Sequence, residues 1–386
     1  MSQSEEPVAA VDRISQLSND ILCHILSFLP IKQAFTTTIL SKRWLRVCYS
    51  LTVLSFNDET VADYETFRRF CRFIDTLMLS NQQESQLKTF SLKCRFWFND
   101  DNHRSFDGWL EAAKQRRVEE FHIFLNNVTM SSNIFISQTL VVLKLENLRV
   151  EDENLCVDLP SLKTLHLKYV CFENQNDIKK VLKACPNLED LHTSYPRYIR
   201  RCKKNKEFRS LFLSKLVKAD IGSNDVPFKV IYNVKFLRVI KVKPSLKKNI
   251  KEFFKGIPVF GNLIHIELWF YGFFHGWDGV VQLLQHCPKL QILYMRKWNT
   301  SVSKDWECPI SDLQCLSSHL RSCTILNFEG SENDLRFAKY ILQNARRLEV
   351  MTIGVNTSSS DGMQKHQIIE ELSTCPRMSS GCKLSF

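Results

Sequence analysis

The first recurring apolar positions lie between residues 21 and 29, at the spacing of a helix. Together they would cover an arc of roughly 160° on its surface, and they are Ile21, Leu22, Ile25, Leu26, Phe28 and Leu29. Ser18 is a good capping residue for such a helix, with Asp20 in the first turn, and Pro30 marks its end. Two more short helices are expected after short connections, over residues 32–39 and from residue 42 onward.

This helical module is too short to be stable alone, because about 40 residues rarely bury enough apolar surface. Its first helix is nevertheless apolar over a wider arc than one neighbouring helix would cover. Either the module packs onto the rest of the chain, or part of the apolar stripe is reserved for another protein. The pattern alone leaves both readings open.

From residue 87 onward, apolar residues recur at the first, fourth and sixth positions of short segments. The segments begin at Leu87, Val118, Leu140, Leu162, Leu188, Leu216, Leu237, Leu263, Leu290, Leu320 and Leu348. Their mean step of about 26 residues lies inside the roughly 20–29 residue period of leucine-rich repeats. A mixed α/β sandwich could show similar strands, but not so many at so steady a step.

Each repeat is expected to supply a strand whose fourth and sixth residues point inward, followed by a returning loop or helix. The apolar stretches 178–185 and 280–284 are predicted as two of these return helices. The seventh segment is taken as Leu237, Ile240 and Val242. The fold class predicted is therefore α/β, with three N-terminal helices followed by a solenoid that has parallel strands inside and helices or loops outside.

The residues of the helical module resemble the plant F-box from Arg13 to about Leu51. The similarity rests on Leu17, Asp20-Ile21-Leu22, Ile25-Leu26, Leu29-Pro30, Ala34 and Leu40-Ser41-Lys42-Arg43-Trp44. In that family the motif binds a Skp-type adaptor, which connects it to a cullin scaffold. Carried over by position, the implied adaptor contacts are Leu17, Leu22, Leu26, Pro30, Ile31, Ser41 and Trp44. The family usually reads Leu-Pro where this chain has Leu17-Ser18.

The C-terminal stretch is similar to the FBD segment that closes many plant F-box/leucine-rich-repeat proteins. The similarity lies in residues 340–353 and in the ending from Gln367 to Phe386. We therefore expect a tail (1–12), an F-box (13–52), a leucine-rich-repeat solenoid (53–314) and an FBD-like cap (315–386). The resemblance implies the substrate-recognition subunit of an SCF-type cullin-RING ubiquitin ligase, whose repeats bind an unidentified target protein.

Residues beside the sixth position of each repeat should face outward on the concave sheet, because strand side chains alternate. The target-binding candidates chosen in this way are Lys241, Lys243, Glu267, Trp269, Tyr294 and Arg296. Trp, Tyr and Arg are the types most often found as binding hot spots. A merely solvated sheet face is the alternative.

Basic residues are concentrated in one region. The chain has a net charge of +11, but residues 197–255 alone carry +14, so the remainder is near −3. The densest run contains Arg197, Arg200, Arg201, Lys203, Lys204 and Lys206. It could attract an acidic or phosphorylated target or nucleic acid, serve as a nuclear import signal, or be a solvated loop. The alternative function is thus a repeat-based nucleic-acid or anionic-surface binder outside a ligase, although nucleic acid is not the expected partner.

The remaining chemistry indicates no enzyme. The 14 cysteines contain no C-x-x-C pair, so no zinc site is expected, and Cys185, Cys287 and Cys375, each before a proline, are expected at buried corners. No phosphate-binding loop is complete and no His-Glu-x-x-His occurs, so we predict no catalytic residue, metal or cofactor. The polar start and the absence of a long apolar run predict an intracellular protein without a membrane segment, in the nucleus and/or cytoplasm.

Overall fold

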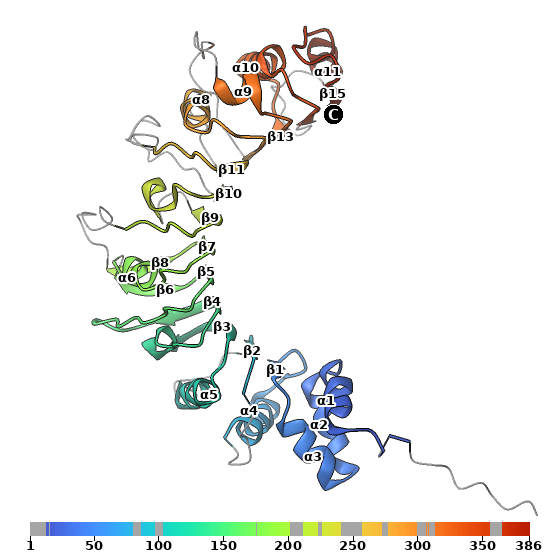
Figure 1. The fold of residues 1–386 in the computed structure, drawn as a ribbon, viewed down its shortest axis with the longest axis vertical. Coiled ribbons are helices and arrows are strands. Elements are labelled where there is room, and N and C mark those ends of the chain that lie inside the picture. Colours follow the sequence, from blue (N-terminus) through green and yellow to red (C-terminus); the bar gives the residue numbers. More distant parts are fainter. Residues whose placement is uncertain are drawn as a thin grey trace, which may run out of the picture.

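The computed structural model describes residues 13–14, 16–79, 86–96, 103–174, 176–200, 211–222, 226–240, 257–271, 277–298, 306, 308, 313–355 and 365–386. Three small helices form the N-terminal end, and a long stack of strands follows. Figure 1 shows the strands along the inner side of an arc and the helices on its outer side. This arrangement confirms the predicted α/β solenoid behind a helical module.

The N-terminal module consists of α1 (Asn19–Ser27), α2 (Ile31–Thr36), the 3-10 turn η1 (Thr37–Ile39) and α3 (Lys42–Tyr49). The predicted cap is present, because the hydroxyl of Ser18 accepts a hydrogen bond from the backbone N–H of Ile21 at 3.4 Å. Leu22 and Leu26 of α1 are buried in the same core as Trp44 of α3. The three predicted helices are thus confirmed.

The module packs directly onto the first repeat. The ring of Phe35 on α2 meets Phe73 of α4 (Tyr64–Met78) edge to face, with centroids 5.3 Å apart. Lys32 donates to the hydroxyl of Thr60 at 3.0 Å and lies over the ring of Phe70. The short module is therefore stabilised by the rest of the chain. This is the first of the two interpretations that the apolar pattern left open.

The described strands form one parallel sheet with the order β1-β2-β3-β4-β5-β7-β9-β10-β11-β12-β13-β14-β15, and β6 and β8 branch from it at β4. Their bounds are β1 Val53–Asn57, β2 Thr89–Cys94, β3 Glu120–Met130, β4 Val142–Val150, β5 Thr164–Lys168, β6 Cys171–Asn174, β7 Asp190–Ser194, β8 Arg197–Arg200, β9 Lys218–Gly222, β10 Phe236–Ile240, β11 His265–Tyr271, β12 Ile292–Trp298, β13 Ser322–Phe328, β14 Val350–Val355 and β15 Lys383–Ser385.

Return segments cover the outer side of the sheet. They are α5 His103–Gln115, η3 Ser132–Phe135, α6 Asp177–Lys183, η5 Phe228–Ile231, α8 Asp278–Gln285, α9 Gln314–Ser318, α10 Glu332–Asn344 and α11 Lys365–Ser373, together with α4. Helices α6 and α8 confirm the two predicted from sequence. The varied lengths of these segments explain the uneven steps between repeats, because only the strands must keep register.

The register of β10 differs from the prediction. Leu237 pairs with Ala219 on β9 and with Ile266 on β11, so it is the fourth residue of its repeat and not the first. The buried set is Val234, Leu237 and Val239. The prediction was wrong by three positions because Ile240 and Val242 are also apolar. A strand with apolar residues on both faces does not specify from its own sequence which face points inward.

Four consecutive repeats turn a corner at a residue with left-handed backbone. These residues are Asn127, Asn147, Tyr169 and Tyr195, with φ between 53° and 59°. After the corner a second short ladder pairs Arg149, Cys171 and Arg197. Asparagine tolerates this conformation, but tyrosine rarely adopts it. The two tyrosine rings stack with centroids 4.8 Å apart.

The last repeats are tied together by a buried ion pair and by aromatic stacking. Lys297 on β12 donates to Asp334 on α10 at 2.6 Å, and their side chains are only 3% and 2% exposed. Trp277 stacks on Phe337 with centroids 3.8 Å apart. Beyond α10, strand β15 extends the sheet by one further parallel pairing with β14. The apolar repeat pattern read from the sequence began at Leu87 and ended with the segment at Leu348, so it included neither β1 nor β15.

Candidate functional site

Helix α1 carries two apolar stripes that face different surroundings. Leu22 and Leu26 are 0% and 1% exposed, whereas Ile21, Ile25 and Phe28 are 47%, 41% and 75% exposed. At 3.6 residues per turn, the exposed stripe lies about 100° around the helix from the buried one. Leu29, Ile39 and Leu40 are also exposed large apolar residues of the module. We name these six residues, Ile21, Ile25, Phe28, Leu29, Ile39 and Leu40, the apolar band.

The adaptor contacts implied by resemblance divide between the inside and the surface of the module. Leu22, Leu26, Ile31 and Trp44 are buried within the chain's own core. Leu17 is half-buried, and Pro30 and Ser41 are exposed. The sequence could not separate the two stripes, because both are apolar and both recur at helical spacing. Ile39 and Leu40 were missed as surface residues, although two adjacent apolar residues just before a helix start were a signal.

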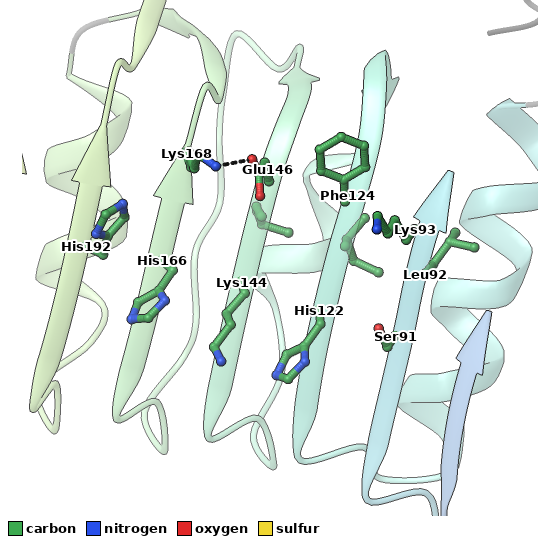
Figure 2. A pocket seen from close by; sticks show the side chains of 12 residues that line it. Ser91, Leu92, Lys93, His122, Phe124, Lys144, Glu146, His166, Lys168 and His192 are labelled. Atoms are coloured by element: carbon green, nitrogen blue, oxygen red, sulfur yellow. Dashed lines mark ion pairs between the residues drawn. The ribbon is translucent and has the colours of Figure 1, made fainter. Parts of the chain in front are cut away.

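A cavity of about 350 Å³ opens on the concave sheet between β2 and β7. Its lining includes six lysine or histidine side chains, Lys93, His122, Lys144, His166, Lys168 and His192, and one carboxylate, Glu146. Figure 2 shows His122, Lys144 and His166 side by side on β3, β4 and β5. The rule that residues beside the sixth position of a repeat face outward also applies to Lys144, His166 and His192, but no motif singled them out as a site.

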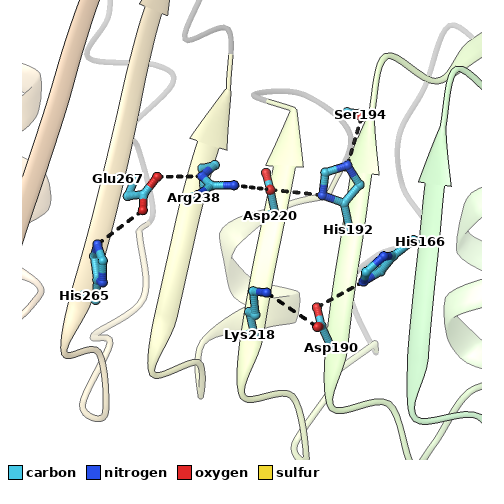
Figure 3. Close-up of polar contacts among 9 residues, drawn as sticks. All are labelled: His166, Asp190, His192, Ser194, Lys218, Asp220, Arg238, His265 and Glu267. Atoms are coloured by element: carbon cyan, nitrogen blue, oxygen red, sulfur yellow. Dashed lines mark hydrogen bonds and ion pairs between the residues drawn. The ribbon is translucent and has the colours of Figure 1, made fainter. Parts of the chain in front are cut away.

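The neighbouring part of the same face is a network of paired charges (Figure 3). Arg238 on β10 donates to Glu267 on β11 at 2.6 Å and to Asp220 on β9 at 2.9 Å. His192 on β7 lies 3.0 Å from the same Asp220 oxygen, and His265 lies 3.4 Å from Glu267. The network therefore crosses four neighbouring strands of the sheet path.

These pairings shift the protonation of their members. Burial opposes the ionisation of Glu267, but hydrogen bonds from His265 and Arg238 outweigh it and lower the pKa of Glu267 to about 2. The hydrogen bond to Glu267 raises the pKa of Arg238, against a smaller opposing effect of burial. Both groups are thus charged at neutral pH. Arg238 was missed from the sequence because the register of β10 was assigned incorrectly.

An aromatic and cationic patch continues the concave face toward the C-terminus. Trp269 and Arg296 pair in register on β11 and β12, as do Glu267 and Tyr294. The guanidinium of Arg296 lies 3.9 Å from the ring centroid of Trp298. The ring centroids of Trp269 and Trp298 are 6.0 Å apart. The indole N–H of Trp269 is buried and has no hydrogen-bond partner among the described residues. Four of the predicted target-binding residues are thus brought together, and Trp298 joins them.

The rest of the predicted basic sites lies mainly outside the described residues. This holds for Lys241, Lys243, Arg201, Lys203, Lys204 and Lys206 and for the side chain of Arg200. Arg197 begins β8 and is exposed. The structure therefore adds only the position of Arg197 to the predicted basic patch.

The described cysteines are all free thiols. Cys185, Cys287 and Cys375 are buried, as predicted for corner positions, and burial raises the pKa of Cys185 to about 12. Within the described ranges, no three His, Cys, Asp or Glu side chains are grouped so that they could hold a metal ion. Among the described helices, none combines the length and apolar character needed to cross a membrane.

Three family models match separate parts of the chain. The F-box domain matches residues 14–56, the LRR repeats of the FBD-associated F-box protein At5g56370 match 106–228, and FBD matches 307–353. These matches follow the same order as the helical module, the solenoid and the C-terminal segment. They confirm the family resemblance found in the sequence.

Several Arabidopsis thaliana proteins are similar over nearly their whole length. F-box/FBD/LRR-repeat protein At5g56420 is 27% identical, with 97% of this chain and 99% of the relative aligned. Putative F-box/FBD/LRR-repeat protein At5g56810 is 28% identical, with 98% of this chain and 97% of the relative aligned. F-box/FBD/LRR-repeat protein At4g26340 is 26% identical, with 97% of this chain and 100% of the relative aligned. The chain thus carries an F-box, a parallel-strand leucine-rich-repeat solenoid and an FBD segment, the combination that the names of these Arabidopsis relatives describe.

Proposed function

We propose that this chain is the substrate-recognition subunit of an SCF-type cullin-RING ubiquitin ligase. The observation that carries the proposal is the apolar band of the helical module, which stays exposed although α2 of the same module packs against α4. Exposed apolar residues gathered on one small module are typical of a protein-binding surface. The proposed occupant is a Skp-type adaptor, which connects the chain to a cullin scaffold.

The proposed target site is the concave face of the solenoid, around Glu267, Trp269, Tyr294 and Arg296. Trp298 and Arg238 extend it, because both contact these side chains. Large aromatic and arginine side chains on a rigid sheet supply contact area at low entropic cost. In this proposal the chain performs no chemistry itself and acts by proximity, since it holds the target near the ubiquitin carrier. The proposed boundary between the F-box and the solenoid remains at residue 52.

The adaptor interface can be tested by pull-down of the full-length chain with a purified Skp-type adaptor. The variant Ile25→Asp/Phe28→Asp places two charges in the apolar band without entering the core, whereas Leu26→Asp would disrupt the fold. The matched control is Phe212→Asp/Val259→Asp, because these apolar residues are similarly exposed elsewhere, at 59% and 63%. We expect capture of wild type and control and loss of capture by the Ile25/Phe28 variant.

Two results would count against this proposal. Equal capture of all three proteins would reject the apolar band as the interface, and absence of capture of the wild type would reject the ligase role. The alternative of a nucleic-acid or anionic-surface binder rests mainly on residues outside the described ranges, so we do not advance it as a second function.

A further inference from the structure

The cavity on the concave sheet brings three basic side chains to adjacent strands. His122 pairs in register with Lys144, and Lys144 with His166, so the three form one row across β3, β4 and β5. Strands lie about 4.8 Å apart, which places the outer two roughly 10 Å from each other. All three border the same cavity of about 350 Å³ (Figure 2).

The carboxylates near the cavity already have partners. Lys168 pairs with Glu146, and Lys93 pairs with Glu59 at 3.1 Å. No ion pair joins Lys144 to any described residue. The central lysine of the row is thus left with an unbalanced charge that faces the cavity.

The two histidines beside Lys144 are also incompletely satisfied. The Nε2 atoms of His122 and His166 are buried, and within the described residues neither makes a hydrogen bond. Glu120 and Asp190 lie 3.8 Å and 3.6 Å from these atoms, which is within ion-pair range for a protonated histidine (Figure 3 draws the contact of His166 with Asp190) but longer than a good hydrogen bond. Buried polar atoms without partners are uncommon in folded proteins and are costly. A bound group with acceptor oxygens would give the two Nε2 atoms the hydrogen-bond partners that they lack.

The next strands of the same row show what a compensated arrangement looks like. There Arg238 stands between Asp220 and Glu267 and makes a hydrogen bond with each. In the β3–β5 part of the row, Lys144 has no ion-pair partner among the described residues, and His122 and His166 have only the more distant carboxylates of Glu120 and Asp190. One part of the face is thus closely paired, whereas the part around Lys144 has room for an additional anion.

We propose that this cavity receives the phosphate of a phosphorylated serine or threonine in the target protein. Three donors on three strands match an anion with three acceptor oxygens, whereas a carboxylate offers only two. The cavity lies near the lower end of ligand-site volumes, roughly 300–1,000 Å³, and so suits one modified side chain. A peptide carrying it can lie across the open sheet on either side. This inference rests on the proposed target-binding function and specifies its chemistry.

The proposal couples phosphate binding to the protonation of His122. Burial lowers the pKa of His122, and Lys144 and His166 lower it further, against the opposite effect of Glu120. A bound phosphate dianion would favour the protonated form of His122. The pKa of His122 lies below its ordinary value of 6.5, and a phosphate monoester takes up its second proton at about pH 6. We therefore expect phosphate affinity to rise as the pH falls from neutrality toward about 6 and to gain little below it.

The test is isothermal titration of the full-length chain with a capped Gly-phosphoserine-Gly peptide. The comparison ligands are the unphosphorylated peptide and inorganic phosphate. The variant is Lys144→Met. The control is Lys88→Met, which removes the same charge from an exposed residue just before β2, outside the cavity lining. His166→Gln provides a second variant, and circular dichroism checks that each protein is folded.

We expect the phosphopeptide to bind at least about tenfold more tightly than the unphosphorylated peptide, and Lys144→Met and His166→Gln to weaken it by about tenfold or more. Lys88→Met should bind as wild type does. Equal binding of both peptides, or equal losses in Lys144→Met and Lys88→Met, would overturn the proposal. If inorganic phosphate binds as tightly as the phosphopeptide, the cavity is a site for a small anion, and the proposal of a phosphorylated target is overturned. Failure to bind while the adaptor is still captured rejects this inference alone and leaves the proposed ligase role standing.

Discussion

Arg238 donates its Nε hydrogen to Glu267 at 2.6 Å across the β10–β11 boundary, and the same guanidinium reaches Asp220 on the other side. The side chains of Asp220 and Glu267 are only 4% and 13% exposed. Two weakly solvated carboxylates on one face are compatible because one cation lies between them. Arg238 is therefore the one described residue that contacts both carboxylates, while His192 and His265 each contact one of them.

Replacing that cation should destabilise the protein. We predict that Arg238→Met lowers the free energy of unfolding by about 2–4 kcal/mol, since it leaves two weakly solvated carboxylates with only His192 and His265 as partners among the described residues. Arg321→Met is the control, because Arg321 pairs with Glu349 where both side chains are more than half exposed, and such pairs contribute under about 1 kcal/mol. Urea denaturation measures both values. Equal losses would show that the network has no special role.

The low pKa of Glu267 predicts a stability that depends on pH. The folded-state pKa of about 2 lies below the ordinary value of 4.5, so the ionised carboxylate stabilises the fold above pH 4.5. That contribution, about 3 kcal/mol, is lost as the pH falls from about 4.5 through about 2. Urea denaturation from pH 7 to pH 2.5 should show a smaller decline for Glu267→Gln than for wild type. Glu349→Gln, at an exposed pair, should follow wild type, and parallel curves for all three would contradict the assignment.

The buried pair of Lys297 and Asp334 should fix α10 onto the sheet. Asp334→Leu removes the carboxylate that pairs with the buried Lys297 ammonium. We expect the free energy of unfolding to fall by about 3–5 kcal/mol. The double variant Lys297→Met/Asp334→Leu removes both charges and should recover most of the loss. Calorimetry reports the stability, and hydrogen exchange reports whether α10 loosens first. A double variant as unstable as the single one would mean that packing, not charge, causes the loss.

The two stripes of α1 predict opposite effects for neighbouring residues. Leu22→Ala creates a core cavity and should cost about 2–5 kcal/mol of stability. Ile21→Ala alters a residue that is 47% exposed, and should change stability by less than about 0.5 kcal/mol. Adaptor capture should weaken for Ile21→Ala and persist for Leu22→Ala wherever that protein remains folded. If Ile21→Ala lowers stability and keeps adaptor capture, while folded Leu22→Ala loses capture, the interface lies on the stripe of Leu22 and Leu26.

Part of the candidate site could be predicted from the sequence. The alternation of Ile266 and Leu268 with Glu267 and Trp269 correctly indicated which side chains face outward, because a strand with one apolar face has only one sensible orientation. The same reasoning failed at β10, where Ile240 follows the pattern of a buried position. Arg238 was consequently overlooked, together with the network that it joins.

The aromatic and ionic contacts between repeats could not be predicted in the same way. Lys297 and Asp334 are 37 residues apart, and nothing in the local pattern joins them. Trp298 lies against Arg296 only because the strand continues past the predicted sixth position. Likewise, the cavity exists because β2–β7 align Ser91, His122, Lys144, His166 and His192 in one row.

The sequence by itself determined the kinds of element and their order: a capped amphipathic helix, a repeated strand and the resemblance of both ends to known motifs. These are local properties, since periodicity and capping depend on residues only a few positions apart. The tertiary structure alone decided which apolar stripe of α1 is buried and which charges on the sheet find partners. Those outcomes depend on residues from separate repeats, and it is the stacking of the strands that brings them within contact distance.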